Sequence, residues 1–561
     1  MSKLKDFINP KTQYTKSGEI NIAYKVLGKG ALDLVYVPGW VSNIDWMFSS
    51  PDLVSFFKEL SKTVRIILFD KRGTGLSDRL VELSTLEDRM EDINAVMNAV
   101  DSKKAILFGH SEGGSAATLF SATYPNKVIS LISFGAFAKR RYSKEYPWAP
   151  KDKEREKLYN MIENDWCSEE NLLEKLAPSR AKDTKFMSWL ANYFRSGASP
   201  AAAIKLTKMN TEVDIVDVLP YVNVPTLLIQ RKGDIDVKIE EGRFIQERIK
   251  EAKFIELEGE DHLFWVGNTE MVLMEMKKFI KKTKPNNTSK KGLKTILFGQ
   301  FKTCNFNANK LDIVAHLIKK YEGEVLLRHQ KNISIAFDVP GKAVHFSISF
   351  LNKFKELGIE LSMGLYINEV TLSGNHILND KDFYMTKIIQ TQLHPNQILA
   401  SKTVKHLLSG SNFNFIENTS VLGFKSNTLI KLYDVSEKEK PSINVEKTTN
   451  FTFSYYDSFL EKVLEIIDNN LENDTISVAL LSKKMRMSER QLQRKIKEMT
   501  NKSPSQLINS ICLNKAKESL MSTNLTVSQT AFKFGFSSPS YFAKCFKKEF
   551  NVNPNVFLKK I

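Results

Sequence analysis

The stretch that decides the fold is ILFGHSEGGSAATLF, Ile106 to Phe120. An apolar run ends in the pattern G-H-S-E-G, with the serine at position 111, and a helical pattern follows directly. The glycines permit a tight turn from strand to helix, which exposes the serine hydroxyl and frees backbone N–H groups around it. Ser111 is therefore a candidate nucleophile.

Apolar runs on both sides of this stretch indicate the sheet that holds it. LDLVYVPG, VRIILFD, KAILFG, VISLISFG, PTLLIQ and KFIELEG alternate with amphipathic segments. This alternation predicts a doubly wound, mainly parallel sheet with helices on both faces. Ligands bind at the carboxyl ends of the strands in such sheets, and Ser111 lies at one of these ends.

A serine nucleophile needs a base that a carboxylate holds in orientation. Asp234 follows the run PTLLIQRKG, and His262 lies in LEGEDHLFW after the next run. Both therefore fall on the same sheet edge as Ser111, in the chain order serine, acid, histidine that this fold favours. The sequence predicts a catalytic triad of Ser111, Asp234 and His262.

Two neighbouring acids bear on this assignment. Asp236 competes with Asp234 for the acid position, whereas Asp261 is interpreted as a loop carboxylate. The expected oxyanion donors are the backbone N–H groups of Trp40, in VYVPGWVSN, and of Glu112.

These residues resemble the α/β-hydrolase family and, more narrowly, the hydrolase domains fused to class III nucleotide cyclase domains in bacteria. The resemblance covers about residues 21–280 and includes FDKRGTGLSD, the serine turn and LEGEDHLFWVGN. It implies a helical cap over residues 139–219 above an apolar pocket. Pro38 stands where a histidine often precedes the oxyanion glycine. The substrate stays open, and such a triad also occurs in domains that only bind a ligand.

The chain is much longer than one hydrolase domain. Its 561 residues suggest three or four domains. Polar stretches at 281–292 and 436–451 are interpreted as linkers. They leave three pieces, at 1–280, 293–435 and 452–561.

The bulk composition narrows the class of protein. Apolar residues make up 42% of the chain and charged residues 26%, values typical of a soluble globular protein. We find no apolar run of about 18 residues and no apolar core in the opening MSKLKDFINPKTQYTK, so we expect no membrane partner and a cytoplasmic location. The four cysteines lie far apart, so we expect no metal site, and no cofactor is expected.

The middle piece, 293–435, resembles the catalytic domain of class III nucleotide cyclases, which implies an α+β fold. At the positions where the family has its catalytic and metal-binding residues, this chain has other residues. Gln300 and Lys331 stand at the two metal-binding aspartates, and Ile388 and Tyr384 at the catalytic arginine and its partner asparagine. Phosphoryl transfer depends on metal charge and positioned cations. We therefore predict that cyclase activity is absent and that this piece senses a ligand or forms a homodimer.

The last piece is strongly basic. The whole chain has a net charge of +17, and residues 481–561 alone contain 16 Lys or Arg against 4 Asp or Glu. A compact basic segment is typical of proteins that bind the phosphate backbone of nucleic acids.

Two helix-turn-helix patterns lie in this basic segment. In SERQLQRKIKEMT, Ser488 is a candidate N-cap with Gln491 three residues later, and Leu492 and Ile496 share one face. In SSPSYFAKCFKKEF, Pro539 suits a first helical turn, and Tyr541, Phe542 and Phe546 are expected in the core. The polar residues expected to face DNA are Arg490, Gln491, Gln493, Arg494, Lys497, Ser540, Lys544, Lys547 and Lys548.

Residues 452–561 resemble the AraC/XylS family of bacterial transcription regulators, with AFKFGFSSPSYFAKCFKKEFNVNPNVF as the closest motif. The resemblance implies an all-α tandem helix-turn-helix domain that binds promoter DNA. It places base contacts at Arg490, Gln493 and Arg494, and near Ser540 and Lys544.

The sequence thus predicts a nucleoid-associated transcription regulator whose hydrolase-like domain senses or processes a small molecule or ester-like substrate. The alternative is an active serine hydrolase with an autoregulatory DNA-binding tail.

Overall fold

The structure is a computed structural model. It describes residues 10–79, 84–164, 166, 173–283, 291–302, 308–329, 331–371, 385–386, 391–422, 429–438, 463, 466–467, 477–500, 503–522, 525–536, 538–550 and 552–558. The chain forms two compact units, Met1–Lys440 and Pro441–Ile561.

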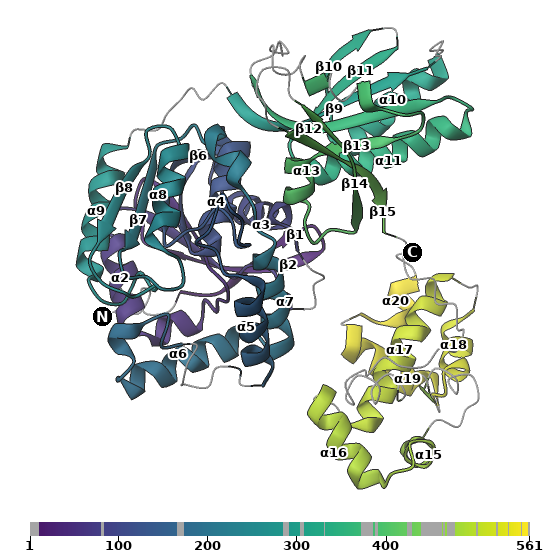
Figure 1. Cartoon of the computed structure of the whole chain (residues 1–561). Coiled ribbons are helices and arrows are strands. Elements are labelled where there is room, and N and C mark those ends of the chain that lie inside the picture. The colour runs from purple at the N-terminus through teal and green to yellow at the C-terminus, as the bar shows by residue number, and fades with distance from the viewer. Residues whose placement is uncertain are drawn as a thin grey trace. The chain divides into compact units, whose positions relative to one another are not determined.

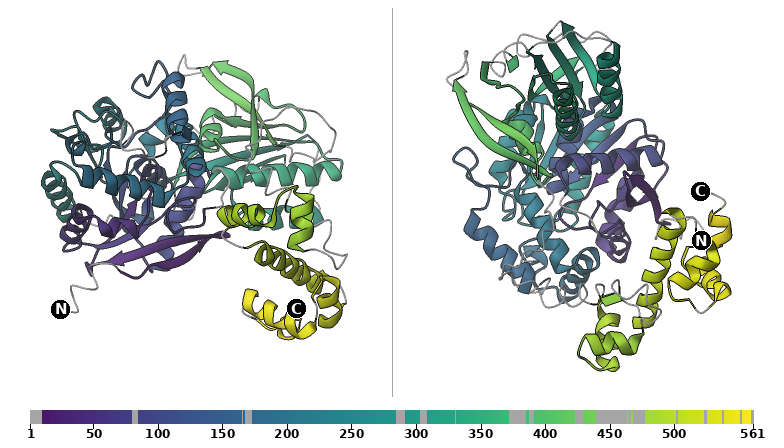
Figure 2. Two further views of the ribbon diagram at one scale, coloured as in Figure 1. Left: turned by 90° about the horizontal axis from the view of Figure 1, so that it is seen from below. Right: turned by 90° about the vertical axis from the view of Figure 1, so that its right-hand side faces the viewer.

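The first unit begins with an eight-stranded sheet in the order β1-β2-β4-β3-β5-β6-β7-β8. The strands from β3 to β8 run parallel, whereas β2 is antiparallel to β4 and β1 is antiparallel to β2. Figure 2 shows this β1–β2 hairpin, in purple, at the edge of the sheet. The bounds are β1 (Gln13–Ser17), β2 (Ile20–Leu27), β3 (Asp33–Val37), β4 (Arg65–Phe69), β5 (Ala105–His110), β6 (Val128–Phe134), β7 (Thr226–Arg231) and β8 (Lys253–Leu257).

Helices cover both faces of this sheet, because successive side chains of each strand point to opposite faces (Figure 1). In β3, Leu34 and Tyr36 join one core, and Val35 and Val37 join the other. Helices α2 (Pro51–Leu60) and α9 (Thr269–Lys282) pack on the first core. Helices α3 (Leu86–Ala99), α4 (Glu112–Thr123) and α8 (Ile239–Arg248) pack on the second. The predicted doubly wound sheet is confirmed.

Between β6 and β7 the chain forms a helical cap. It contains α5 (Asp152–Asn164), α6 (Thr184–Gly197), α7 (Pro200–Thr211) and the short 3-10 helices η3 (Pro178–Arg180) and η4 (Val216–Tyr221). Buried residues of α6 and α7, among them Leu190 and Leu206, belong to the first core. The cap is therefore packed on the sheet domain.

A second sheet of seven strands follows, in the order β10-β11-β9-β12-β13-β15-β14. Its first elements alternate as β9-α10-β10-β11-α11-β12, and the four strands lie in the order β12-β9-β11-β10 with antiparallel neighbours. This is the split βαβ arrangement of ferredoxin-like α+β folds. The bounds are β9 (Lys291–Phe301), α10 (Ala308–Lys320), β10 (Glu324–His329), β11 (Asn332–Phe337), α11 (Pro340–Glu356), β12 (Leu361–Thr371), β13 (Ile398–Ser401), α13 (Lys402–Leu407), β14 (Phe413–Leu422) and β15 (Leu429–Glu437).

The two sheets belong to one unit because the second packs on the second core of the first. Leu293, Val339 and Leu407 join the residues of α3 and α4 there. The N–H of Gly341 donates to the buried carboxylate of Glu87 at 2.9 Å. The range 281–292, which the sequence predicts as a linker, is partly in regular structure. Helix α9 runs to Lys282, and Lys291 already pairs with β12.

The second unit is helical and has its own core. The helices of its described residues are α15 (Val478–Lys484), α16 (Glu489–Thr500), α17 (Pro504–Ser522), α18 (Val527–Lys533), α19 (Pro539–Phe550) and α20 (Pro554–Leu558). Leu481, Leu492, Leu513 and Phe542 are among its buried residues.

The predicted cap of α16 is confirmed. The Gln491 N–H donates to the Ser488 hydroxyl at 3.3 Å, and the Ser488 N–H donates to the Gln491 side chain at 3.0 Å. Thr526 and Gln529 form the same reciprocal cap at the start of α18.

Candidate functional site

Ser111 lies in a strained turn between β5 and α4. Its φ of +54° is in the left-handed region that non-glycine residues rarely adopt. The turn is also tightly packed, because a Cβ on Gly113 would lie 2.1 Å from the Val37 carbonyl oxygen. This sharp strand-to-helix turn presents the Ser111 side chain to a cavity.

Asp234 and His262 meet at the same edge of the sheet, after β7 and β8. His262 Nδ1 lies 2.8 Å from Asp234 Oδ2, and each residue is only 2% exposed. The other Asp234 oxygen accepts the N–H groups of Asp236 and Val237, which fixes the carboxylate. His262 lines the cavity together with Ser111. No hydrogen bond joins their side chains among the described residues, and such contacts often tighten only when substrate binds.

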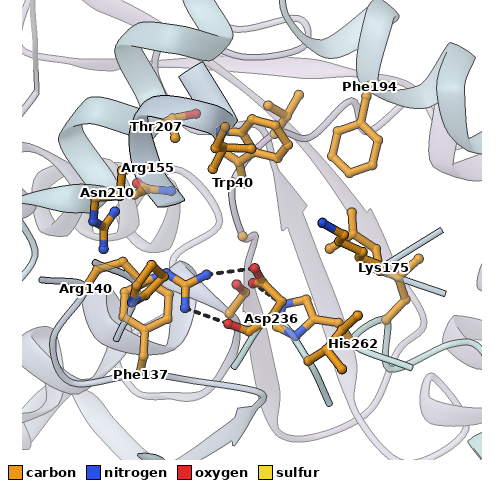
Figure 3. Close-up of a pocket in the computed structure, with 18 of the residues that line it drawn as sticks. Trp40, Phe137, Arg140, Arg155, Lys175, Phe194, Thr207, Asn210, Asp236 and His262 are labelled. Atoms are coloured by element: carbon orange, nitrogen blue, oxygen red, sulfur yellow. Dashed lines mark hydrogen bonds and ion pairs between the residues drawn. The ribbon is translucent and has the colours of Figure 1, made fainter. Parts of the chain in front are cut away.

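The competing acids have other partners. Asp236 Oδ1 pairs with Arg140 Nη2 at 2.8 Å, and its Oδ2 lies 3.8 Å from His262 Nε2, the nitrogen opposite Asp234 (Figure 3). Asp261 accepts the N–H of Ser179 at 3.0 Å, as expected of a loop carboxylate. The histidine is therefore oriented by Asp234.

The two histidines of the site have opposite electrostatic character. Burial lowers the pKa of His262, but the charge and hydrogen bond of Asp234 outweigh it and raise that pKa above its ordinary value. Burial, together with His262, lowers the pKa of His110 to about 3. His110 is therefore neutral, and its Nε2 donates to the His262 carbonyl at 3.0 Å.

Backbone donors lie beside Ser111. The N–H groups of Trp40 and Glu112 have no hydrogen-bond partner within the described ranges. The Glu112 side chain points away into the protein, where it pairs with Lys71 and Arg89. This buried cluster holds the first turn of α4, and it leaves the Glu112 N–H available to a ligand.

The cavity has a volume of about 910 Å³ and is closed on one side by α5 and α7 of the cap. Its apolar wall includes Tyr36, Trp40, Phe137, Phe194 and Trp265. Figure 3 shows Trp40 and Phe194 on one side of His262 and the Arg140–Asp236 pair on another. The lining combines aromatic surface with a few polar groups, as small-molecule sites do.

Sequence reasoning did not find the cap residues Arg140, Arg155 and Asn210, although all three line the cavity. They belong to no motif. Arg155 and Asn210 reach the cavity only through the packing of α5 and α7 over the sheet, and Arg140 lies in the segment between β6 and α5. The sole signal in the sequence is the pair of arginines that follows β6 at residues 140 and 141.

In the second unit, α16 and α19 divide into inner and outer faces. Leu492 and Ile496 of α16 and Phe542 and Phe546 of α19 are fully buried. The nine residues predicted to face DNA are all exposed: Arg490, Gln491, Gln493, Arg494, Lys497, Ser540, Lys544, Lys547 and Lys548. The expected burial of Tyr541 is wrong, since it is 47% exposed. Tyr541 lies about 100° around the helix from Phe542, off the core face.

The positions compared with cyclase chemistry are only partly visible. Gln300 lies in β9, where it pairs with Asn332, and Lys331 is exposed in the β10–β11 turn. Ile388 and Tyr384 lie outside the described residues. In the described ranges, no three His, Cys, Asp or Glu side chains are placed to hold a metal ion.

Two family models match separate parts of the chain. The α/β hydrolase fold matches residues 34–267, and a helix-turn-helix domain matches residues 481–560. The first unit therefore contains an α/β hydrolase domain and the second a helix-turn-helix domain. Within the part of the chain that the structure describes, no helix is long and apolar enough to cross a bilayer.

Individual relatives match only part of the chain. The chain is 35% identical over 101 residues to a histidine kinase of Formosa agariphila, a match to 18% of this chain and 7% of the kinase. It is 25% identical to epoxide hydrolase 1 of Caenorhabditis elegans, over 48% of this chain and 70% of that enzyme. The solved bromoperoxidase of Bacillus anthracis is 22% identical, with a TM-score of 0.44 over 48% of this chain and 100% of its own.

Proposed function

We propose that this protein is a sequence-specific transcription regulator of the AraC/XylS type that recognises a small molecule through its hydrolase domain. The observation that carries the proposal is the second unit. Its helix-turn-helix match coincides with two helices whose apolar faces are buried and whose outer faces expose arginine, glutamine and lysine. Such helices bind phosphates and base edges in the major groove.

In this proposal the Ser111 cavity is the effector site. Its volume and aromatic lining suit a small organic ligand. The end of the cap segment contacts the middle piece directly, since the Thr403 hydroxyl donates to Asp217 Oδ2 at 2.8 Å and His406 Nδ1 lies 3.2 Å from Asp214 Oδ2. A change at the cap therefore has a packed route to the middle piece. A ligand shifts promoter binding only if it binds two states of the protein with different affinity.

The middle piece acts as a cyclase-like scaffold without cyclase chemistry. Its split βαβ order supports this interpretation. The exposed Lys331 in the β10–β11 turn carries a charge that would repel Mg²⁺. We assign this piece to transmission or homodimerisation, and the whole protein to the cytoplasm, in association with the nucleoid.

A second function is favoured by the geometry of the cavity. The buried Asp234–His262 pair and the strained Ser111 turn match the requirements of an active serine hydrolase. The catalytic roles would be nucleophile for Ser111, base for His262 and orienting acid for Asp234. The N–H groups of Trp40 and Glu112 would bind the oxyanion.

Genome-wide mapping of binding sites, with and without a covalent serine-hydrolase probe, tests both proposals. We expect discrete promoter sites whose occupancy changes when the probe fills the cavity. Sites unaffected by a bound probe would refute the coupling. Failure of the full chain to prefer any promoter fragment over scrambled DNA would refute the regulator.

A further inference from the structure

We propose that the Ser111 cavity selects ligands that carry a carboxylate group remote from the reacting carbonyl, and that Arg155 of the cap binds this carboxylate. The inference rests on the proposed role of the cavity as a ligand site, and it names the chemical class of that ligand.

The first observation is a buried guanidinium that is incompletely bound. Arg155 is only 5% exposed, and its Nη1 donates to the Thr211 hydroxyl at 2.7 Å. Its Nε and Nη2 are buried and have no hydrogen-bond partner among the described residues. A guanidinium offers its donors in a rigid fork that matches a carboxylate. Burying it without a counter-charge is unfavourable, so an anionic ligand would gain from that site.

The second observation is the contrast with Arg140 in the same cavity. Arg140 pairs with Asp236, whereas no carboxylate in the described ranges pairs with Arg155. Burial and the nearby Arg140 lower the pKa of Arg155 to about 10, so the side chain stays protonated at neutral pH. Among the described residues, the wall of the cavity thus holds a positive charge that no carboxylate pairs with.

Neighbouring groups complete the subsite. The Asn210 side-chain oxygen is buried and has no hydrogen-bond partner in the part of the chain that the structure describes, and Asn210 lines the cavity beside Arg155 (Figure 3). The Asn210 amide can turn to donate its NH₂ to a second carboxylate oxygen. The charged residues of the lining also favour an anionic ligand, because positively charged residues outnumber the two acidic ones, Glu154 and Asp236. These cations are Arg140, Arg155, Lys157, Lys175 and Lys238.

The cavity therefore has two ends of different chemistry. His262 lies on one side, and Arg155 and Asn210 lie on the other, on α5 and α7 (Figure 3). Aromatic side chains such as Phe137 and Trp148 line the space as well. A ligand with an ester or acyl group, a short aliphatic chain and a terminal carboxylate would contact all three surfaces.

The test compares two esters of equal chain length on the full-length protein. One is the p-nitrophenyl monoester of glutaric acid, which keeps a free carboxylate, and the other is the neutral p-nitrophenyl pentanoate. We expect the wild type to have the higher kcat/KM for the acidic ester. Arg155→Met should lower the ratio of acidic to neutral kcat/KM about 10- to 100-fold, mainly through KM. Arg155→Lys should keep part of the wild-type ratio.

Lys153→Met is the matched control, because it removes the same charge from the exposed side of α5. It should leave the ratio unchanged. A wild type that prefers the neutral ester, or an Arg155→Met variant that loses both activities equally, would overturn the carboxylate subsite. If Arg155→Met does not fold, the same ratio of acidic to neutral kcat/KM is measured in Arg155→Lys and Asn210→Leu. Both variants should lower it.

A binding readout separates this inference from the proposed enzyme function. Glutarate should raise the unfolding temperature of Ser111→Ala protein, and 1,5-pentanediol should not. If neither ester is hydrolysed but glutarate still stabilises the protein in an Arg155-dependent way, the subsite stands and the hydrolase fails. If hydrolysis proceeds and glutarate has no effect, the subsite fails alone.

Discussion

The Ser111 cavity and the outer face of α16 and α19 both present polar side chains, but the protein builds them in opposite ways. In the cavity Asp234 and His262 are almost fully buried and hold each other. On the helices the polar side chains are exposed, and only the apolar face is fixed. Buried charges interact strongly and depend on exact neighbours, whereas exposed ones are screened by water and salt. Single substitutions should therefore have much larger effects in the cavity than on the helices.

The largest effect is expected for Ser111→Ala. Removal of the nucleophile should lower kcat/KM for p-nitrophenyl esters about 10⁴- to 10⁶-fold, because the histidine then has no hydroxyl to activate. Steady-state hydrolysis and labelling by a fluorophosphonate measure the loss. The promoter affinity of the ligand-free protein should stay unchanged. Hydrolysis within tenfold of the wild type would show that Ser111 is not the nucleophile.

Asp234→Asn comes next and tests which acid orients the histidine. Its amide cannot hold His262 in the productive tautomer, so we expect a loss of about 10⁴-fold in kcat. Asp236→Asn is the matched control, since Asp236 faces the other ring nitrogen and pairs with Arg140. A larger loss in Asp236→Asn than in Asp234→Asn would reverse the assignment.

The pH dependence of hydrolysis tests the electrostatics of the same pair. His262 must be neutral to act as a base, and Asp234 raises its pKa. Activity should therefore fall as the pH decreases through a value above about 6.5, the ordinary histidine pKa. In Asp234→Asn the residual activity should persist to lower pH, because the carboxylate that raises the pKa is gone. Equal profiles of kcat/KM in both proteins would contradict this.

The effects on the outer face of α16 and α19 should be smaller and should differ in kind. Arg494→Ala should weaken binding to a specific site by about 1–3 kcal/mol, since an arginine fork reads guanine directly. Lys548→Ala should weaken binding to all sequences alike and reduce the salt dependence, as expected of a phosphate contact. Fluorescence anisotropy on specific and scrambled duplexes at several salt concentrations separates the two. Equal losses on both duplexes for both variants would refute the assignment.

The sequence predicts the site residues of these two regions through different physical rules. The positions of Ser111, Asp234 and His262 follow from one rule, since the ends of parallel strands meet at one sheet edge. The outer face of α16 follows from helical periodicity, with Leu492 and Ile496 marking the inside.

The subsite around Arg155 could not be predicted in this way. Arg155 and Asn210 meet only because α5 and α7 pack together over the cavity, and no short-range pattern encodes that packing. The antiparallel β1–β2 hairpin was missed for a related reason. Its strands lie at the sheet edge, and they are less uniformly apolar than the central strands.

The smallest effect is expected at the start of α16. Ser488→Ala removes the hydroxyl that accepts the Gln491 N–H, and an N-cap loss of this kind destabilises a helix by about 0.5–2 kcal/mol. Chemical denaturation of the full chain should show a lower midpoint for the second, helical unit. The midpoint of the first unit should not change, because each unit has its own core. Thr526→Ala at α18 is the matched control for capping without a predicted base contact. If Ser488→Ala weakens promoter binding more than Thr526→Ala at equal loss of stability, α16 itself contacts DNA. If the two variants weaken binding equally, the loss reflects unfolding of the unit, and α16 has no direct role in reading the promoter.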